Sequence, residues 1–245
     1  ALLDAALHSA RALAPCATDE LRLDRAALAL EAGVARRDGR LLDQAGRDLR
    51  ALVESASPDY RPLTRARALA LAGTGLIALA DLAGSEPARA QGRELFEAAA
   101  DQFTPDHSPL DWVAVRLARA GDETPLLVLA EAEALSREPG LILGALARER
   151  RLAAEADLAE AMGDVETLTG LEAVLRRRLA ESARIEPLDW AADQLGMARL
   201  AVARGRLTST PPRAVGLMRA EAAATAREWG ALALARRAEE GLEVA

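Results

Sequence analysis

Lysine is absent from this sequence, and cysteine, histidine and aromatic residues are scarce. All 31 basic residues are Arg, Cys16 is the single cysteine, and His8 and His107 are the two histidines. One cysteine cannot form an internal disulfide, and one Cys with two His cannot assemble a typical zinc shell. We therefore expect neither a metal site nor a cofactor, and the redox compartment stays open.

Catalytic motifs are missing too. Nucleophilic catalysis needs a Cys or Ser held beside a His, and no recognisable motif of that kind surrounds either histidine. No glycine-rich phosphate-binding loop follows a strand. Gly73 and Gly75 fall within a helical stripe, where small residues more simply allow two helices to approach closely. These absences favour a protein that is not an enzyme, and an all-helical enzyme is the least supported alternative.

Strand-forming residues are also in short supply. Apolar residues make up 51% of the chain, yet they are mostly Ala and Leu, and aromatic residues contribute only 2%. Strands favour β-branched and aromatic residues, whereas Ala and Leu are strong helix formers. The composition therefore predicts an all-α protein whose helices pack closely over Ala.

The charge balance bears on possible partners. A net charge of −7 is unfavourable for nucleic acid or an anionic membrane, because both attract concentrated positive charge. No uninterrupted apolar run reaches the roughly 18 residues of a membrane-spanning helix. We expect no nucleic acid partner, no membrane insertion and a cytoplasmic protein. The sequence starts at Ala1 rather than Met, which leaves open an upstream leader, anchor or domain.

Apolar residues recur at helical spacing through most of the chain, which places them on one face of an α-helix. Glycines interrupt these runs at intervals of 37 to 45 residues, at Gly39, Gly84, Gly121, Gly163 and Gly205. Glycine can adopt the left-handed conformation that ends a helix, so we expect each of them to cap one. This period predicts one helical hairpin per unit, and such units must stack to bury their apolar faces.

The tetrapeptide Pro-Leu-Asp-Trp occurs twice, from Pro109 and from Pro187, 78 residues apart. Proline is tolerated in the first turn of a helix, and Asp is favourable near the positive end of the helix dipole. Ser108, before the first copy, is expected to be an N-cap. Because 78 residues are close to two periods, both copies are predicted to begin the first helix of a hairpin, two units apart.

The second copy resembles the tetratricopeptide repeat (TPR) family, in particular bacterial arrays whose units begin with Pro-Leu-Asp-Trp-Ala. The segment PLDWAADQLGMARLAVARG, residues 187–205, keeps those five residues, Gln194, and a glycine fifteen residues after Trp190. It departs in the middle, because the family's Leu-Gly pair would fall on Met197 and Ala198. The motif agreement is therefore strong only in this segment.

Other segments resemble the family less closely. In GRELFEAA, Gly92, Phe96 and Ala99 stand at the family's second-helix positions. The first residues of the chain also resemble a second helix, so we expect the sequence to be cut from something longer. The copy from Pro109 is degenerate, because Gly121 follows early and shortens its first helix by about six residues, over one and a half turns.

The resemblance implies an α-solenoid of stacked antiparallel helical hairpins, a TPR-like right-handed superhelix with degenerate repeats, in a single domain over residues 1–245. The expected units are a half repeat at 1–16, then 17–58, 62–105, 109–137, 141–184 and 187–245. The expected structural signature of the repeat is Trp112, Trp190, Gly121, Gly163 and Gly205.

First helices line the concave groove of a TPR array. Mapped back from each glycine onto the family's pattern, six charged side chains are expected in that groove, namely Arg36, Asp81, Arg150, Asp157, Glu160 and Arg199. The resemblance thus implies a non-enzymatic scaffold for protein-protein interaction that binds a peptide or helix of a partner, with a homo-oligomer left open. Rigid hairpins would leave the ordering cost of binding mainly to the peptide.

Two arginine clusters allow a second interpretation of the charges. They lie at 148–151 and 176–178, and are most simply polar helix faces paired at helical spacing with Glu149, Glu155, Glu172 and Glu181. The alternative is an Arg-lined groove that clamps acidic side chains or a C-terminal carboxylate, for which the planar fork of Arg is suited.

A different class of function is also compatible with this sequence. The hairpins could be the regulatory or oligomerisation domain of a larger signalling protein or enzyme whose active domain lies outside the chain. An upstream catalytic or DNA-binding domain would favour this hypothesis over the scaffold.

Overall fold

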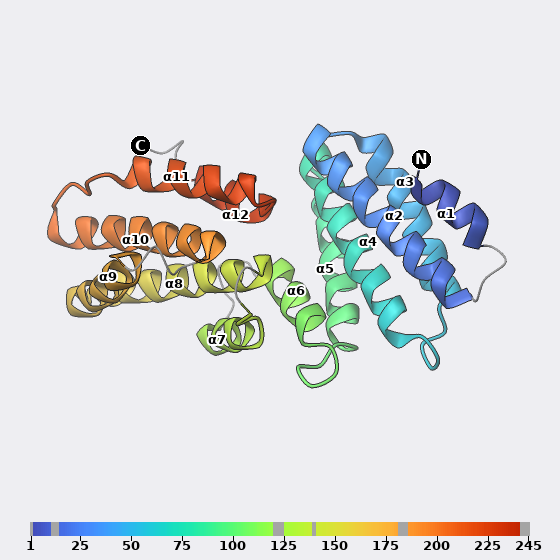
Figure 1. Cartoon of the computed structure of the whole chain (residues 1–245), viewed down its shortest axis with the longest axis horizontal. Coiled ribbons are helices and arrows are strands. Elements are labelled where there is room, and N and C mark those ends of the chain that lie inside the picture. The colour runs from blue at the N-terminus through green and yellow to red at the C-terminus, as the bar shows by residue number, and fades with distance from the viewer. Residues whose placement is uncertain (1, 11–14, 120–124, 139–140, 181–185, 241–245) are drawn as a thin grey trace. The chain divides into compact units, whose positions relative to one another are not determined.

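The computed structural model describes residues 2–10, 15–119, 125–138, 141–180 and 186–240. These residues form helices joined by turns, with no strand among them (Figure 1). The predicted all-α class is therefore confirmed for this part of the chain. The helices belong to two compact units, residues 1–119 and 120–245.

The described residues of unit 1 form six helices: α1 (Leu2–Ala10), α2 (Pro15–Arg36), α3 (Gly39–Ser55), α4 (Pro62–Ala83), α5 (Glu86–Ala100) and α6 (Pro109–Arg119). Each helix contacts the next one along the chain, and Figure 1 shows α2 to α5 side by side as successive hairpins. In addition, α2 contacts α4, and α4 contacts α6. The first helices of successive hairpins are therefore neighbours in space.

The core of unit 1 lies between α2, α3 and α4. Its buried side chains are Leu23, Ala26, Leu30, Leu42, Ala45, Leu49, Leu52 and Ala68. They recur every three or four residues, so each helix turns one apolar stripe inward. Burying a Leu side chain contributes about 1.5–3 kcal/mol, so the five Leu side chains of this cluster stabilise the unit.

Two glycines set the distance between α4 and α5. A Cβ atom on Gly73 would lie 2.9 Å from the carbonyl oxygen of Gly92, and a Cβ on Gly92 would lie 3.0 Å from that of Gly73. Both contacts are too short for a side chain, so only glycine permits this approach. The prediction that Gly73 serves close helix packing is confirmed.

Length and apolar composition alone would let α4 cross a membrane, a property that core helices of soluble proteins share. In unit 1, α4 contacts α2, α3, α5 and α6, and it buries Ala66, Ala68, Leu69 and Ala80 against them. Of its most apolar stretch of 18 residues, 28% is buried, so packing within unit 1 accounts for part of its apolar character.

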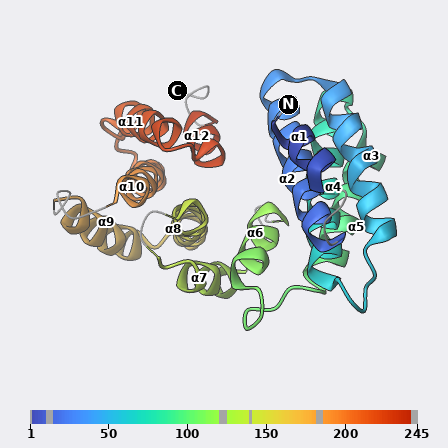
Figure 2. The same cartoon turned by 45° about the vertical axis from the view of Figure 1, so that its right-hand side comes forward.

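Unit 2 contains α7 (Leu126–Leu135), α8 (Ile142–Met162), α9 (Val165–Ala180), α10 (Pro187–Thr208), α11 (Val215–Glu228) and α12 (Leu232–Glu239). Helix α8 contacts α7, α9 and α10, and α10 contacts α9 and α11. The chain then returns through α11 and α12, and α12 contacts α8 (Figure 2). The core includes Leu152, Leu168, Leu175, Met197 and Leu200.

The predicted starts of the hairpin units agree with the helices. The first helices α2, α4, α6, α8 and α10 begin at Pro15, Pro62, Pro109, Ile142 and Pro187, against expected unit starts at 17, 62, 109, 141 and 187. Helix α6 is described over Pro109–Arg119, and the residues that follow lie outside the described part, so the shortened helix expected there stays a prediction. Helix α12 was not predicted. It makes the segment from 187 a group of three helices rather than a hairpin.

The boundary between the two units falls inside the predicted hairpin 109–137, with α6 in unit 1 and α7 in unit 2. Each unit contains its own core. One continuous stack over the whole chain therefore stays a prediction.

Glycine ends two helices as predicted. Gly84 (φ 66°) and Gly163 (φ 69°) adopt the left-handed conformation after α4 and α8. The expectation was wrong at Gly39, which is the first residue of α3, because Arg37 (φ 51°) takes the left-handed position after α2. There Asp38 caps α3 by accepting a hydrogen bond from the backbone N–H of Arg40 at 2.9 Å.

The expectation was also wrong at Gly205, which lies inside α10. This helix continues to Thr208, and Ser209 (φ 53°) is the left-handed residue after it. Gly205 has a packing role instead, because a Cβ atom there would lie 2.6 Å from the carbonyl oxygen of Thr210. Gly121 lies outside the described residues.

Candidate functional site

The Asp of each Pro-Leu-Asp-Trp segment forms an ion pair with an Arg of the preceding first helix. In unit 1, Asp111 of α6 accepts hydrogen bonds from Arg67 of α4, with Nε–Oδ1 at 3.0 Å and Nη2–Oδ2 at 2.9 Å. In unit 2, Nη1 of Arg148 in α8 lies 3.1 Å from Oδ1 of Asp189 in α10. The repeated Asp thus links neighbouring first helices, beyond the helix-dipole role that was expected.

Other charged pairs also link one first helix to the next, or to Arg61, which directly precedes α4. Their partners are Asp19 with Arg61, Asp157 with Arg199, and Glu160 with Arg206, which lie 42, 42 and 46 residues apart. These separations equal about one unit of the repeat. A charge on one first helix therefore meets the opposite charge on the next, in both units.

Unit 1 contains a cavity of about 350 Å³ on the face formed by its first helices. Residues of α2, α4 and α6 line it, together with Phe103 from the α5–α6 connection. Leu23, Phe103 and Val115 are buried and supply apolar wall. The volume is within the usual range of ligand pockets, about 300–1,000 Å³.

The polar side chains of this cavity are mostly acidic. Glu20, Asp24 and Asp111 contribute carboxylates, and among the described residues Arg67 is the one cation that lines it. Arg67 is already engaged by Asp111, and its Nη1 lies 3.7 Å from Oε2 of Glu20. The cavity therefore combines an apolar wall with an excess of negative charge.

The six predicted groove residues are divided between the units, and the two in unit 1 do not line its cavity. Arg36 is exposed at the end of α2. Asp81 is exposed on α4 and pairs with Arg89 of α5 at 2.7 Å. Both lie toward the C-terminal ends of their helices, whereas the cavity residues of α4 and α6 lie near the starts of those helices. A groove role for Arg36 and Asp81 therefore stays a prediction.

The other four predicted residues lie in unit 2. Asp157 and Arg199 form an ion pair, with Arg199 Nε 2.7 Å from Asp157 Oδ1, and both line a second cavity of about 220 Å³. Glu160 pairs with Arg206 at 3.1 Å. Arg150 is half-buried on α8 and does not line this cavity.

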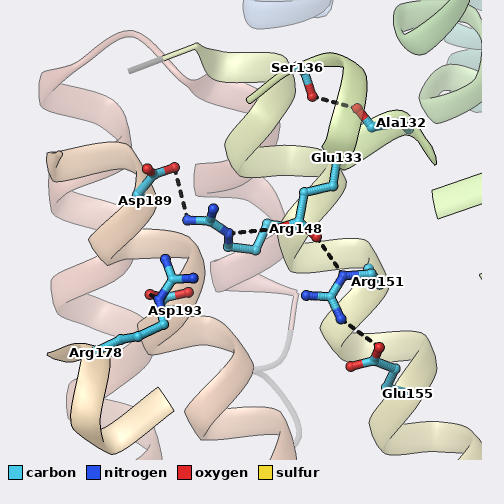
Figure 3. Close-up of polar contacts among 9 residues, drawn as sticks. All are labelled: Ala132, Glu133, Ser136, Arg148, Arg151, Glu155, Arg178, Asp189 and Asp193. Carbon is cyan, nitrogen blue, oxygen red and sulfur yellow. Dashed lines mark hydrogen bonds and ion pairs between the residues drawn. The ribbon is translucent and has the colours of Figure 1, made fainter. Parts of the chain in front are cut away.

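The arginine cluster at the start of α8 belongs to a network between α7, α8 and α10 (Figure 3). Glu133 of α7 accepts hydrogen bonds from Arg148 Nε at 3.0 Å and from Arg151 Nε at 2.5 Å. Burial by itself would raise the pKa of Glu133, but these two guanidinium groups outweigh it and hold that pKa below its usual value. Arg148 then extends the network to Asp189.

Asp193 is the most deeply buried acid of this region, with 0% of its surface exposed. Its Oδ2 lies 2.9 Å from Nε of Arg178 in α9, as Figure 3 shows. Burial raises the pKa of Asp193, although the charges of Arg178 and Arg148 oppose that shift. The pair ties α9 to α10 at a cost in desolvation.

The simple interpretation of the arginine clusters is confirmed in part. Arg151 pairs with Glu155 at 2.5 Å and Arg176 with Glu172 at 3.4 Å, both one helical turn apart. The same clusters also reach other helices, since Arg148 and Arg151 bind Glu133. Glu172 also accepts a hydrogen bond from Arg204 of α10 at 2.7 Å. Glu181 lies outside the described residues.

The two signature tryptophans occupy similar positions. Trp112 of α6 is buried and Trp190 of α10 is half-buried. The guanidinium of Arg116 lies 5.4 Å from the centre of the Trp112 ring, a cation–π contact one turn along the helix. These contacts agree with the expected packing role.

Sequence reasoning missed Glu20, Asp24 and Arg67 in the unit 1 cavity. A usable signal was present, because Arg67 precedes Asp111 by 44 residues, about one unit of the repeat. Within the described residues, no group of three or more His, Cys, Asp or Glu side chains is placed to hold a metal ion.

Comparison with known proteins finds no matching family model, no similar curated protein and no similar solved structure.

Proposed function

We propose that this chain is a non-enzymatic, TPR-like scaffold that binds a segment of another protein on the first-helix face of unit 1. The observation that carries the proposal is the 350 Å³ cavity lined by α2, α4 and α6. Three successive first helices form its walls, which is where a helical-repeat array presents a groove to a peptide or helix.

The chemistry of the cavity defines the segment that it accepts. Buried Leu23, Phe103 and Val115 favour an apolar side chain in the cavity. Glu20 and Asp24 are exposed and leave negative charge beside it. The partner segment therefore carries an apolar anchor next to Arg or Lys, because opposite charges speed association and discriminate against acidic segments.

A selection experiment tests this proposal. Random peptides displayed on phage are selected on the wild-type chain, and the enriched peptides are measured for binding by fluorescence anisotropy. Apolar peptides with adjacent Arg or Lys are the expected result. Enrichment of acidic peptides, or no enrichment at all, contradicts the proposal.

Substitutions locate the binding. Ala114→Trp fills the cavity and is expected to abolish binding, whereas Ala90→Trp, on an exposed position of α5 away from the cavity, is the matched control and keeps it. Asp24→Arg reverses one cavity charge and is expected to weaken binding about 5–10-fold at low salt. Asp59→Arg is its exposed control between α3 and α4. If each cavity variant binds the peptide with the same affinity as its control variant, the peptide binds elsewhere.

A further inference from the structure

The second cavity, in unit 2, gathers three arginine side chains from three helices. Arg199 of α10, Arg219 of α11 and Arg237 of α12 line a space of about 220 Å³. Three carboxylates belong to the same lining, namely Glu149 and Asp157 of α8 and Glu240, which directly follows α12. Because α12 contacts α8 and contributes one wall, the cavity suits a small ligand better than a helix.

Two of the three arginines have carboxylate partners. Arg237 binds Glu149 through both Nε and Nη2, the second at 3.0 Å from Oε1. Arg199 binds Asp157 at 2.7 Å. The two carboxylates of α8 are thus each engaged by an arginine.

Arg219 differs from the other two. Its Nε is buried, and among the described residues no acceptor forms a hydrogen bond with it. Burial lowers the pKa of the Arg219 guanidinium and Arg199 lowers it further, while Glu149 opposes the shift. Arg219 as a whole is half-buried, but a buried N–H without an acceptor is costly, and a bound ion or ligand is one way to satisfy it.

We propose that Arg219, with Arg199 and Arg237 beside it, binds the oxyanion group of a small ligand, a carboxylate or a phosphate. The planar fork of Arg matches both groups with paired hydrogen bonds. An incoming anion would satisfy Arg219 and relieve its repulsion with Arg199. This site is separate from the peptide site proposed for unit 1, and either can fail without the other.

The test follows the side-chain Nε–H signals of arginine by ¹H–¹⁵N NMR in the full chain. Inorganic phosphate and, separately, malonate are titrated at constant ionic strength against sodium chloride. The signal lost in Arg219→Gln identifies Arg219, and it is expected to shift saturably with at least one anion. Comparison of the two titrations tells a phosphate site from a carboxylate site.

Thermal unfolding supplies an independent reading. An anion at about ten times its Kd is expected to raise the Tm of the wild type by about 3–6 °C. Arg219→Gln is expected to lose this increase. Arg213→Gln removes the same charge but is expected to keep the increase in Tm, because Arg213 is exposed in the turn before α11. Arg219→Lys retains the charge without the fork and is expected to bind about tenfold more weakly.

Three outcomes overturn the site. They are no saturable effect of either anion on the wild type, the same Kd in Arg219→Gln as in the wild type, or shifts that grow linearly in every variant, which means an adventitious ion only. Circular dichroism of each variant confirms folding. If Arg219→Gln does not fold, the comparison of wild type, Arg219→Lys and Arg213→Gln decides the question.

Discussion

Arg67 in α4 holds both carboxylate oxygens of Asp111 in α6, at 3.0 and 2.9 Å, across 44 residues of sequence. Arg148 and Asp189 form an ion pair at corresponding positions of unit 2, through one contact of 3.1 Å. The Asp of Pro-Leu-Asp-Trp is therefore a link between successive first helices. Both copies of the tetrapeptide supply this link.

The first prediction measures that link in unit 1. Arg67→Met, Asp111→Asn and the double variant form a double-mutant cycle in urea unfolding. We expect a coupling energy of about 0.5–1 kcal/mol, because the bidentate geometry is favourable but the side chains are 43% and 26% exposed and water screens them. Additive effects of the two substitutions would show that the pair contributes no stability.

The second prediction concerns the contact of α4 with α5. Gly73→Ala places a Cβ atom 2.9 Å from the carbonyl oxygen of Gly92, so the helices must separate. We expect a loss of about 1–3 kcal/mol in the free energy of unfolding. The control is Gly46→Ala in the middle of α3, where a Cβ meets nothing within 4 Å, and it should gain about 0.5–1 kcal/mol. Similar effects at both positions would rule out close packing at Gly73.

The third prediction is the acid dependence contributed by Glu133. Arg151 and Arg148 hold its folded-state pKa below the usual value, so the ionised carboxylate stabilises the fold above the unfolded pKa. That contribution is lost as the pH falls through the lowered folded pKa. Urea unfolding from about pH 6 to about pH 3 should therefore show a smaller loss of stability in Glu133→Gln than in the wild type. Parallel curves would mean that the pKa of Glu133 is not lowered.

The fourth prediction has the opposite sign. Burial raises the folded-state pKa of Asp193 above its unfolded value, so its contribution is fully present below the unfolded pKa and is lost as the pH rises through the folded one. The stability of Asp193→Asn relative to the wild type should therefore increase as the pH rises from about 3.9. A relative stability that falls over this range would show that Arg178 and Arg148 outweigh burial.

Helical periodicity was enough to predict the fold class and the starts of the first helices. Pro62, Pro109 and Pro187 begin helices because the first turn lacks a partner for the missing N–H. Helix ends were harder to predict. Arg37 and Ser209 take the left-handed conformations that Gly39 and Gly205 were expected to supply.

The sites depended on contacts that periodicity does not determine. Arg67 and Asp111 are on different helices, and only the packing of α4 against α6 brings them together. Similarly, Arg219 and Arg237 line the same cavity as the Arg199–Asp157 pair because the chain returns through α11 and α12. Helix α12 was not predicted. The sequence shows which opposite charges lie one unit apart. It does not show which of these charged side chains face a cavity.

The most direct test of the scaffold proposal is photo-crosslinking of a selected peptide to the first-helix face of unit 1. The photoreactive residue p-benzoylphenylalanine replaces Ala70, which lines the cavity, or Ala90 on α5, which does not. We predict a crosslink from position 70 that excess unlabelled peptide removes, and none from position 90. Equal crosslinking from both positions, or crosslinking from position 90 alone, would contradict peptide binding at this face.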